Sequence, residues 1–469
     1  MKPKRRMNSY CLLLAETVVR AIRKPARLAA AMGLIVAIGA TGSLAGPGWA
    51  QTLPQYANDV HLGVASCAGS TCHGAVTPWR GSTVLQNEYV TWQSKDPHAK
   101  AYTVLLNEDS RRIARNLGLP NAHEAKICLD CHANNVPANL RSKTFQISDG
   151  VSCEACHGGA VRWLGVHISG AANHAQNVAA GMYPTEDPVA RAKLCMSCHV
   201  GTKDKFVTHK IMGAGHPRMP FELDTFTVTQ PAHFRIDVDY QQRKRVADPV
   251  QTWAVGQAVA VQMTLEGLAD PNRNRQGIFP ELVFFDCHAC HHPMSNLRWE
   301  PRASTGLGPG VVRLADGNMI MLRIIAGQID PALGERLLQQ SRALHAATAQ
   351  GMDAVATAAS AMRGIVDPLV TRLAQTRFDG KAMGELLRAV IREGLGREYT
   401  DYAAAEQATM AIAAILNAMK RGGHIDEAQY KRYDAVLDKA YKAVERDEVF
   451  KPKDFIAALD ALDQVVLKN

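Results

Sequence analysis

Ten cysteines of this chain stand in five pairs, and in every pair the second cysteine is followed directly by a histidine. Four pairs have two residues between their cysteines, and the first pair, in CAGSTCHG at residues 67–74, has four. The paired cysteines are Cys67, Cys72, Cys128, Cys131, Cys153, Cys156, Cys195, Cys198, Cys287 and Cys290. The histidines that follow them are His73, His132, His157, His199 and His291.

Three kinds of chemistry use paired cysteines: disulfide bonding in an exported protein, zinc binding, and covalent attachment of c-type haem. Disulfides and zinc place no demand on the residue after the second cysteine, and zinc sites built from two pairs each would leave one pair over. Haem attachment requires this order, because two thiols add to the vinyl groups at one porphyrin edge and the adjacent histidine binds the iron. The pattern therefore predicts five covalently bound haem c groups, with the five histidines as proximal iron ligands.

The first pair differs from the others in the length of its spacer. Its four intervening residues, 68–71, are Ala, Gly, Ser and Thr, which are small and flexible. The backbone can therefore bulge while both thiols still reach the porphyrin edge. We interpret this stretch as the first haem site.

The N-terminus has the pattern of a signal peptide, residues 1–50, with cleavage expected after Ala50. Basic residues precede an uncharged apolar run at 28–46, and small residues stand before the expected cleavage position. An uncleaved membrane anchor is the alternative. Without residues 1–50 the formal net charge falls from +9 to +2, so the basic composition gives no reason to expect nucleic acid. A periplasmic location is expected.

The fold class is expected to be mainly α with long loops: a multi-haem cytochrome c core followed by an all-helical C-terminal bundle. The pentahaem domain is assigned to residues 51–300, because five motifs share too few residues for five separate domains. Residues 301–318 have the composition of a linker. Residues 319–469 contain no cysteine and carry apolar side chains at helical spacing, which predicts the bundle.

The other histidines decide whether each iron has a second axial ligand or a vacant coordination position. A second histidine fills the coordination of an iron and suits electron transfer, whereas a missing one leaves a position for a substrate. The candidate second ligands are His98, His167, His174, His209 and His216. His61, His123 and His233 are expected to be solvated loop histidines, and His345 and His424 to be structural or exposed.

Two of these candidates stand in distinctive local sequences. His98 follows Trp92 in a stretch expected to form a helix against a flat apolar surface. His216 stands between Gly215 and Pro217, which favour a turn that would hold the imidazole against an iron.

At GVSCEACHG (150–158) and AGHPRMPFEL (214–223) the sequence resembles the cytochrome c-554 family of multi-haem cytochromes. The resemblance covers about residues 61–295. It implies haems stacked in pairs with few strands, in a fold related to the haem cores of hydroxylamine oxidoreductase and octahaem tetrathionate reductase. It also implies that His216 and His98 are distal ligands.

The sequence departs from this family in three places. The usual Ser-x-His spacing is stretched to Ser94-x-x-x-His98, which weakens the assignment of that ligand. There are five motifs where the small carrier has four. Residues 301–469 have no counterpart in that carrier.

We therefore expect a periplasmic five-haem cytochrome that transfers single electrons between protein redox partners, with no catalytic residue. One alternative is an oxidoreductase acting on a small nitrogen or sulfur compound at one open-coordination haem. Another is a haem-wire subunit that docks a partner complex through its C-terminal bundle. No nucleic acid partner is expected, and membrane contact only through an uncleaved anchor or a membrane-bound partner.

Overall fold

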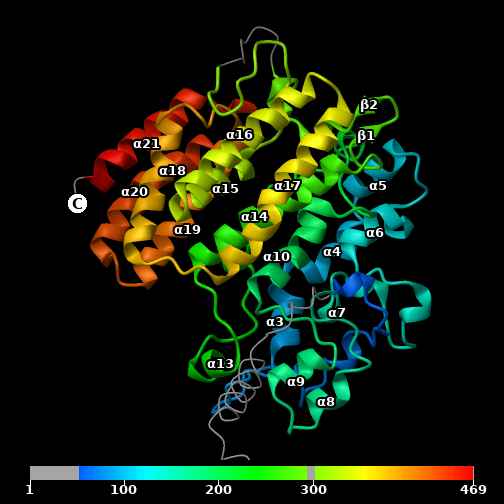
Figure 1. The fold of residues 1–469 in the computed structure, drawn as a ribbon. Coiled ribbons are helices and arrows are strands. Elements are labelled where there is room, and N and C mark those ends of the chain that lie inside the picture. The colour runs from blue at the N-terminus through cyan, green and yellow to red at the C-terminus, as the bar shows by residue number, and fades with distance from the viewer. Residues whose placement is uncertain (1–51, 293–300, 468–469) are drawn as a thin grey trace, which may run out of the picture. The chain divides into compact units, whose positions relative to one another are not determined.

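The computed structural model describes residues 52–292 and 301–467, which form helices joined by long loops (Figure 1). The chain from Thr52 onward makes one compact unit. The predicted signal peptide, residues 1–50, lies outside the described residues. None of the helices in the described ranges is long and apolar enough to cross a membrane.

The mainly helical fold class is confirmed. In the described part of the chain, the named strands are β1 (Arg275–Gln276) and β2 (Phe279–Pro280). They pair antiparallel as a hairpin, with Arg275 opposite Pro280. Gly277 at the turn has φ 65°, the left-handed conformation that tight hairpins need. Ile278 beside it is 92% exposed, so the hairpin tip projects into solvent.

Short helices make up the part of the chain that holds the first four motifs. They are α3 (Glu88–Lys95), α4 (Ala101–Val104), α5 (Glu108–Asn116), α6 (Lys126–His132), α7 (Cys153–His157), α8 (Leu164–Ile168), α9 (His174–Ala179), α10 (Pro188–Met196), α11 (His209–Gly213), α12 (Leu223–Thr229) and α13 (Val238–Arg243). Capping side chains set their ends. For α10, the Asp187 carboxylate accepts hydrogen bonds from the backbone N–H groups of Val189 and Ala190, and Pro188 takes the first position.

Longer helices form the C-terminal bundle. They are α15 (Gly317–Ile329), α16 (Pro331–Thr348), α17 (Met352–Gln375), α18 (Gly380–Leu395), α19 (Tyr402–Arg421), α20 (Glu427–Ala443) and α21 (Pro452–Leu467). At the start of α16, Asp330 caps the helix and Pro331 takes the first position. Leu333, Leu337 and Leu344 of this helix are buried, which agrees with the apolar helical spacing predicted for this part of the chain.

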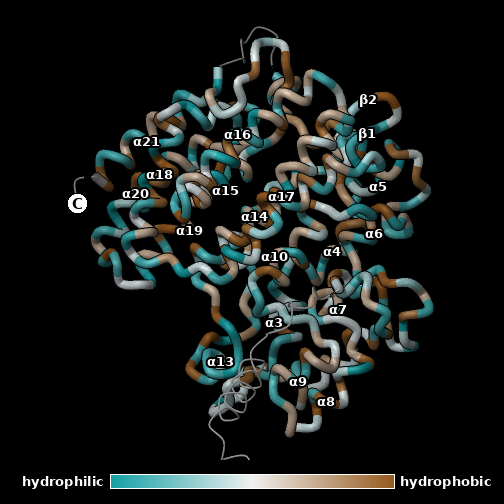
Figure 2. Tube along the Cα trace, viewed as in Figure 1, coloured by the Kyte–Doolittle hydropathy of each residue, from teal (hydrophilic) through white to brown (hydrophobic). Residues whose placement is uncertain are grey.

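Helix α14 (Pro249–Ala269) joins the two parts of the chain. It packs against α10 and α12 and also against α15, α17 and α19 of the bundle. Its side chains are apolar almost all round, and Trp253, Val259 and Leu265 are fully buried. Figure 2 shows the hydropathy of these helices along the chain. One core cluster therefore runs from α10, which carries the fourth motif, through α14 into the bundle.

Candidate multi-haem site

Helical turns carry four of the five cysteine–histidine motifs. The second and third motifs lie on α6 and α7. The fourth begins on α10 and ends in one turn of π-helix, Ser197–Gly201. The fifth forms a 3₁₀ turn at Cys287–Ala289. A single turn of this kind brings the histidine close to its two thiols, as attachment of one porphyrin requires.

The first motif folds into an irregular turn. The backbone N–H groups of Cys72 and Gly74 both donate to the carbonyl oxygen of Gly69, at 2.9 Å each. A Cβ atom on Gly74 would stand 2.0 Å from the Ala68 carbonyl oxygen. The four-residue spacer therefore closes back on the residue after the motif histidine, and glycine is required there.

None of the motif cysteines, all of which lie in the described ranges, forms a disulfide, and their side chains bring the motifs together in pairs. The Cys67 thiol of the first motif lies beside the Cys153 thiol of the third, and this contact lowers the pKa of Cys67. The Cys131 thiol of the second motif lies beside the Cys198 thiol of the fourth, and this contact lowers the pKa of Cys198. Lys205 also donates to the Cys198 sulfur at 3.1 Å. Sites 1 and 3 thus adjoin at their thiol edges, and so do sites 2 and 4.

Each motif histidine faces a second histidine from elsewhere in the chain. The ring centres lie 5.9 Å apart in His73–His167, 6.4 Å in His132–His216, 6.4 Å in His157–His233, 6.3 Å in His199–His98 and 6.1 Å in His291–His209. The second histidines come from α8, from the loops after α11 and α12, from the 3₁₀ turn Pro97–Lys100 and from the start of α11. One spacing therefore recurs at all five motifs.

This spacing fits an iron bound between two imidazoles. An imidazole nitrogen binds a metal at about 2.0–2.1 Å and its ring centre lies about 1.1 Å further back, so two rings on opposite sides of an iron have centres about 6.3 Å apart. Rings that simply pack together also fall at ~4.5–7 Å, so one such pair would carry little weight. Five such pairs, each containing one motif histidine, favour iron binding over simple ring packing.

Backbone carbonyls orient both rings of the second site. Nδ1 of His132 lies 3.0 Å from the carbonyl oxygen of Ala101, and Nδ1 of His216 lies 2.8 Å from that of Pro217. A carbonyl oxygen only accepts, so Nδ1 donates in both rings and Nε2 keeps its lone pair. This is the tautomer that an axial ligand needs.

Carboxylates orient one ring at the first site and one at the fourth. Nδ1 of His73 lies 2.9 Å from Glu88, and Nδ1 of His98 lies 2.8 Å from Asp96. These hydrogen bonds raise the pKa of both histidines. Burial acts against ionisation of Asp96, but hydrogen bonds from His98 and Gln230 outweigh it and lower the pKa of Asp96 to about 2. The carboxylate is therefore ionised at neutral pH.

Burial keeps five of the other rings neutral. It lowers the pKa of His157 to about 3, and it also lowers the pKa of its partner His233. The same cause lowers the pKa of His132, His167 and His199. A neutral imidazole offers a nitrogen lone pair at pH 7, as metal binding requires.

The structure brings four of the five candidate second ligands opposite motif histidines: His98, His167, His209 and His216. It places His174 elsewhere, with Nε2 2.7 Å from a carboxylate oxygen of Glu186. The fifth partner is His233, which we expected to be a solvated loop histidine. The loop after α12 has no periodicity that marks His233, so only its tertiary position reveals it.

Two further histidines are buried, and neither lies opposite a motif histidine. His61 is fully buried, and its Nδ1 accepts a hydrogen bond from Asn134 at 2.9 Å, so the expectation of a solvated ring was wrong. His345 is also fully buried and donates to the Ser341 carbonyl oxygen at 2.8 Å, a structural role. In the described ranges, no group of three or more His, Cys, Asp or Glu side chains is arranged to hold a metal ion.

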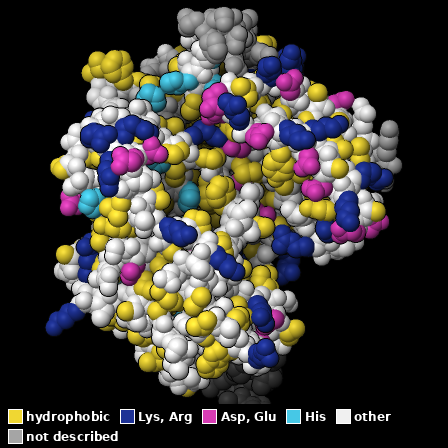
Figure 3. Space-filling view, turned by 180° about the vertical axis from the view of Figure 1, so that it is seen from behind, with side chains coloured by type: hydrophobic (Ala, Val, Ile, Leu, Met, Phe, Trp, Pro, Cys, Tyr) yellow, Lys and Arg dark blue, Asp and Glu magenta, His cyan; other side chains and the backbone are white. Residues whose placement is uncertain are grey.

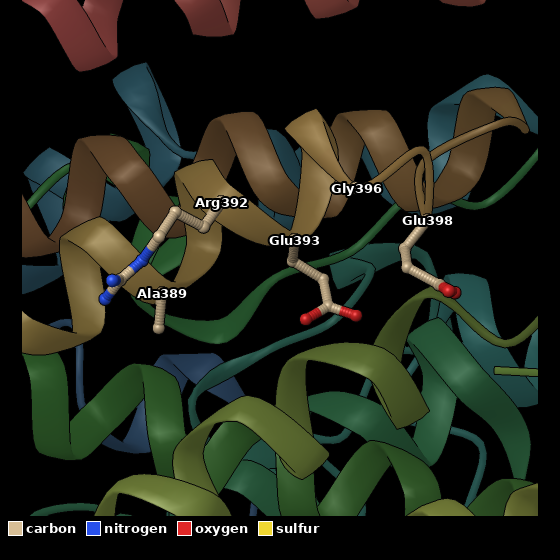
Figure 4. A pocket seen from close by; sticks show the side chains of 5 residues that line it. All are labelled: Ala389, Arg392, Glu393, Gly396 and Glu398. Atoms are coloured by element: carbon tan, nitrogen blue, oxygen red, sulfur yellow. The ribbon is translucent and has the colours of Figure 1, made fainter. Parts of the chain in front are cut away.

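A surface pocket lies at the end of α18 and the turn that follows (Figure 4). It is lined by Ala389, Arg392, Glu393, Gly396 and Glu398. None of these residues belongs to a cysteine–histidine motif, and we assign the pocket no part in the haem sites.

Cysteine–histidine motifs on short turns, each facing a second histidine, are the arrangement of a c-type cytochrome. More particularly, residues 66–158 match the family model of cytochrome c554 and c-prime. This segment contains the first three motifs and His98, and it supports the predicted resemblance to the cytochrome c family, which implies covalently bound haem c. The further relation to hydroxylamine oxidoreductase stays a prediction. No curated protein and no solved structure matches the chain.

Proposed function

We propose that the chain is an exported cytochrome that holds five haem c groups, each with two histidines on its iron, and transfers single electrons between redox proteins. The observation that carries this proposal is the spacing of 5.9–6.4 Å between each motif histidine and a second histidine. Haem c, when bound, supplies a reversible one-electron couple at iron. The chain's own residues attach the group, orient it and exclude other ligands.

The proposed ligand pairs use all five motifs. They are His73 with His167, His132 with His216, His157 with His233, His199 with His98, and His291 with His209. The oxidoreductase alternative needs one iron with an open position. The proposed pairs leave none open, so we favour electron transfer and propose no catalytic residue.

Partner proteins need access to the irons. The side chains of His73 and His98 are 31% and 41% exposed, and Figure 3 shows histidine side chains at the surface on one face. Sites 1 and 4, and site 5 with its exposed His291, are thus places where a donor or acceptor can approach. Export to the periplasm and a signal peptide cleaved after Ala50 remain part of the proposal, because attachment of c-type haem takes place outside the cytoplasm.

Electron paramagnetic resonance (EPR) of the oxidised protein, together with a count of covalent haem by mass spectrometry, tests the proposal. We expect a mass increase of five haems and only low-spin iron, unchanged by nitrite, hydroxylamine or cyanide. A high-spin signal of one haem's weight that shifts with these ligands would support the oxidoreductase alternative instead.

A matched pair of variants tests the least expected ligand. His233→Ala should convert one haem from low-spin to high-spin, because it removes one axial imidazole. His174→Ala should leave all haems low-spin, because this histidine faces Glu186 and no motif. The reverse result would assign the third iron to His174 and overturn the proposed pair.

A further inference from the structure

One short helix carries two carboxylates that contact proposed iron ligands. Helix α3 begins at Glu88 and ends at Lys95, and Asp96 is the residue that follows its last turn. Glu88 contacts His73 of the first site and Asp96 contacts His98 of the fourth. The two contacts therefore stand at the two ends of one eight-residue helix.

Glu88 is held in position by its own surroundings. One carboxylate oxygen lies 2.9 Å from Nδ1 of His73, and the other accepts a hydrogen bond from the backbone N–H of Gln86 at 3.1 Å. The side chain stands in the first turn of α3, where the partial positive charge of the helix start favours a carboxylate. Its side chain is only 17% exposed, so water competes weakly for the contact.

Asp96 is fixed more tightly. Its side chain is 2% exposed. One oxygen meets both the ring Nδ1 and the backbone N–H of His98, at 2.8 and 3.0 Å, and the other accepts from the Gln230 amide at 2.8 Å. Gln230 lies three residues before His233, the proposed ligand of the third site. The carboxylate is thus braced from two segments and cannot turn away from the ring.

A carboxylate that accepts a hydrogen bond from the N–H group of an axial imidazole makes that ligand more basic. A more basic ligand, with a negative charge behind it, stabilises ferric iron over ferrous iron and lowers the reduction potential. The second site offers the contrast, because both of its rings donate to neutral carbonyl oxygens, of Ala101 and Pro217.

We propose that Glu88 and Asp96 are positioning residues that lower the reduction potentials of the first and fourth haems. The inference rests on that function, since it takes His73 and His98 as iron ligands. With these contacts, the two haems are stronger reductants than they would be without the carboxylates.

The test uses the full haem-loaded protein with Glu88→Gln or Asp96→Asn, followed by potentiometric titration monitored by EPR and absorbance. Each variant keeps the shape of the side chain, and Asn also keeps the capping role of Asp96. We expect one haem in each variant to become easier to reduce by at least tenfold in its equilibrium constant, about 59 mV for a one-electron couple.

Two controls separate the hydrogen bond from other effects. Glu186→Gln removes a matched carboxylate–imidazole contact of 2.7 Å at His174, which faces no motif, and should leave every potential in place. Glu88→Asp keeps the charge but shortens the side chain, so it should reproduce part of the shift of Glu88→Gln. Potentials that move no further in Glu88→Gln and Asp96→Asn than in Glu186→Gln would overturn the inference.

The wild-type EPR spectrum distinguishes a failure of the proposed tuning from a failure of the proposed ligand pairs. If all haems are low-spin and the potentials do not move, the tuning is wrong and the ligand pairs stand. If the wild type has a high-spin haem, the proposed pairs themselves are wrong. Should a variant lose a haem, Glu88→Asp gives a second test at the first site, because the shorter side chain weakens the contact with His73 and should also raise one potential.

Discussion

At the scale of single residues, the proposed ligand pairs differ in the angle between their ring planes. His73 and His167 are nearly parallel at 13°, and His209 and His291 are at 36°. The other three pairs are nearly perpendicular, at 83°, 87° and 88°. The relative orientation of two axial imidazoles sets the splitting of the iron d orbitals that overlap their π systems.

The ring planes predict two classes of EPR signal. Parallel planes split the two π-type d orbitals and give a rhombic low-spin spectrum, whereas perpendicular planes leave them nearly equal in energy and give a strongly anisotropic one. We expect two haems in the first class and three in the second by quantitative low-temperature EPR. Five rhombic haems would contradict the perpendicular geometries. Glu88→Gln should then shift a rhombic signal, and Asp96→Asn a strongly anisotropic one.

The sequence identifies the motif histidine of each proposed ligand pair, but it says much less about the second histidine. Cysteine and histidine positions of a motif are local, because adjacency in the chain is what the attachment chemistry requires. The opposite ligand depends on tertiary structure alone. His174 and His233 are both surplus histidines outside the motifs, and only the folded chain places His233 opposite His157 and His174 beside Glu186.

At the scale of elements, the turn of the first motif depends on one glycine. Gly74→Ala would bring a Cβ within 2.0 Å of the Ala68 carbonyl oxygen, so the spacer must open. We expect the variant to carry one haem fewer, counted by intact-mass spectrometry. Gly165→Ala on α8 is the matched control, because its Cβ would meet nothing within 4 Å. Full haem content in Gly74→Ala would show that the turn tolerates the strain.

Helix starts with a cap and a proline were predictable, and α16 is an example. Helix α14 was not recognised, because its apolar residues surround the helix and leave no face for periodicity to mark. The boundary between residues 51–300 and 319–469 is drawn from amino-acid composition, which carries no information about how the two parts pack. In the structure α14, from the first part, supplies a central element of the core that the second part needs.

At the scale of the whole molecule, a buried ionic cluster ties the fifth motif to the bundle. Arg302 is fully buried and pairs with Asp401 at 2.7 Å and with Asp316. Arg313 lies 3.2 Å from Asp286, the residue before the fifth motif. Charges buried together in this way are costly to separate, because each would be left without a partner away from water. The ionic cluster and the α14 core therefore join the haem-bearing part and the bundle.

A shared core predicts unfolding as one unit. Trp253→Ala should destabilise the chain by about 3–5 kcal/mol, because it leaves a cavity in the middle of α14. The far-UV circular dichroism of the helices and the haem absorbance should still change together on heating, at a lower temperature than in the wild type. Ile278→Ala at the exposed hairpin tip should change neither. Two separate transitions would mean that the bundle folds independently.

The thiol contacts between motifs bear on how the protein matures. Cys67 lies beside Cys153 and Cys131 beside Cys198, and in each case the partner belongs to a different motif. A chain that folded before receiving its porphyrins would hold these sulfurs ready for oxidation to crosslinks between motifs, and such crosslinks would block thioether formation. If the chain is assembled in an oxidising compartment, as proposed, a reductant must keep the thiols reduced until each has formed its thioether bond.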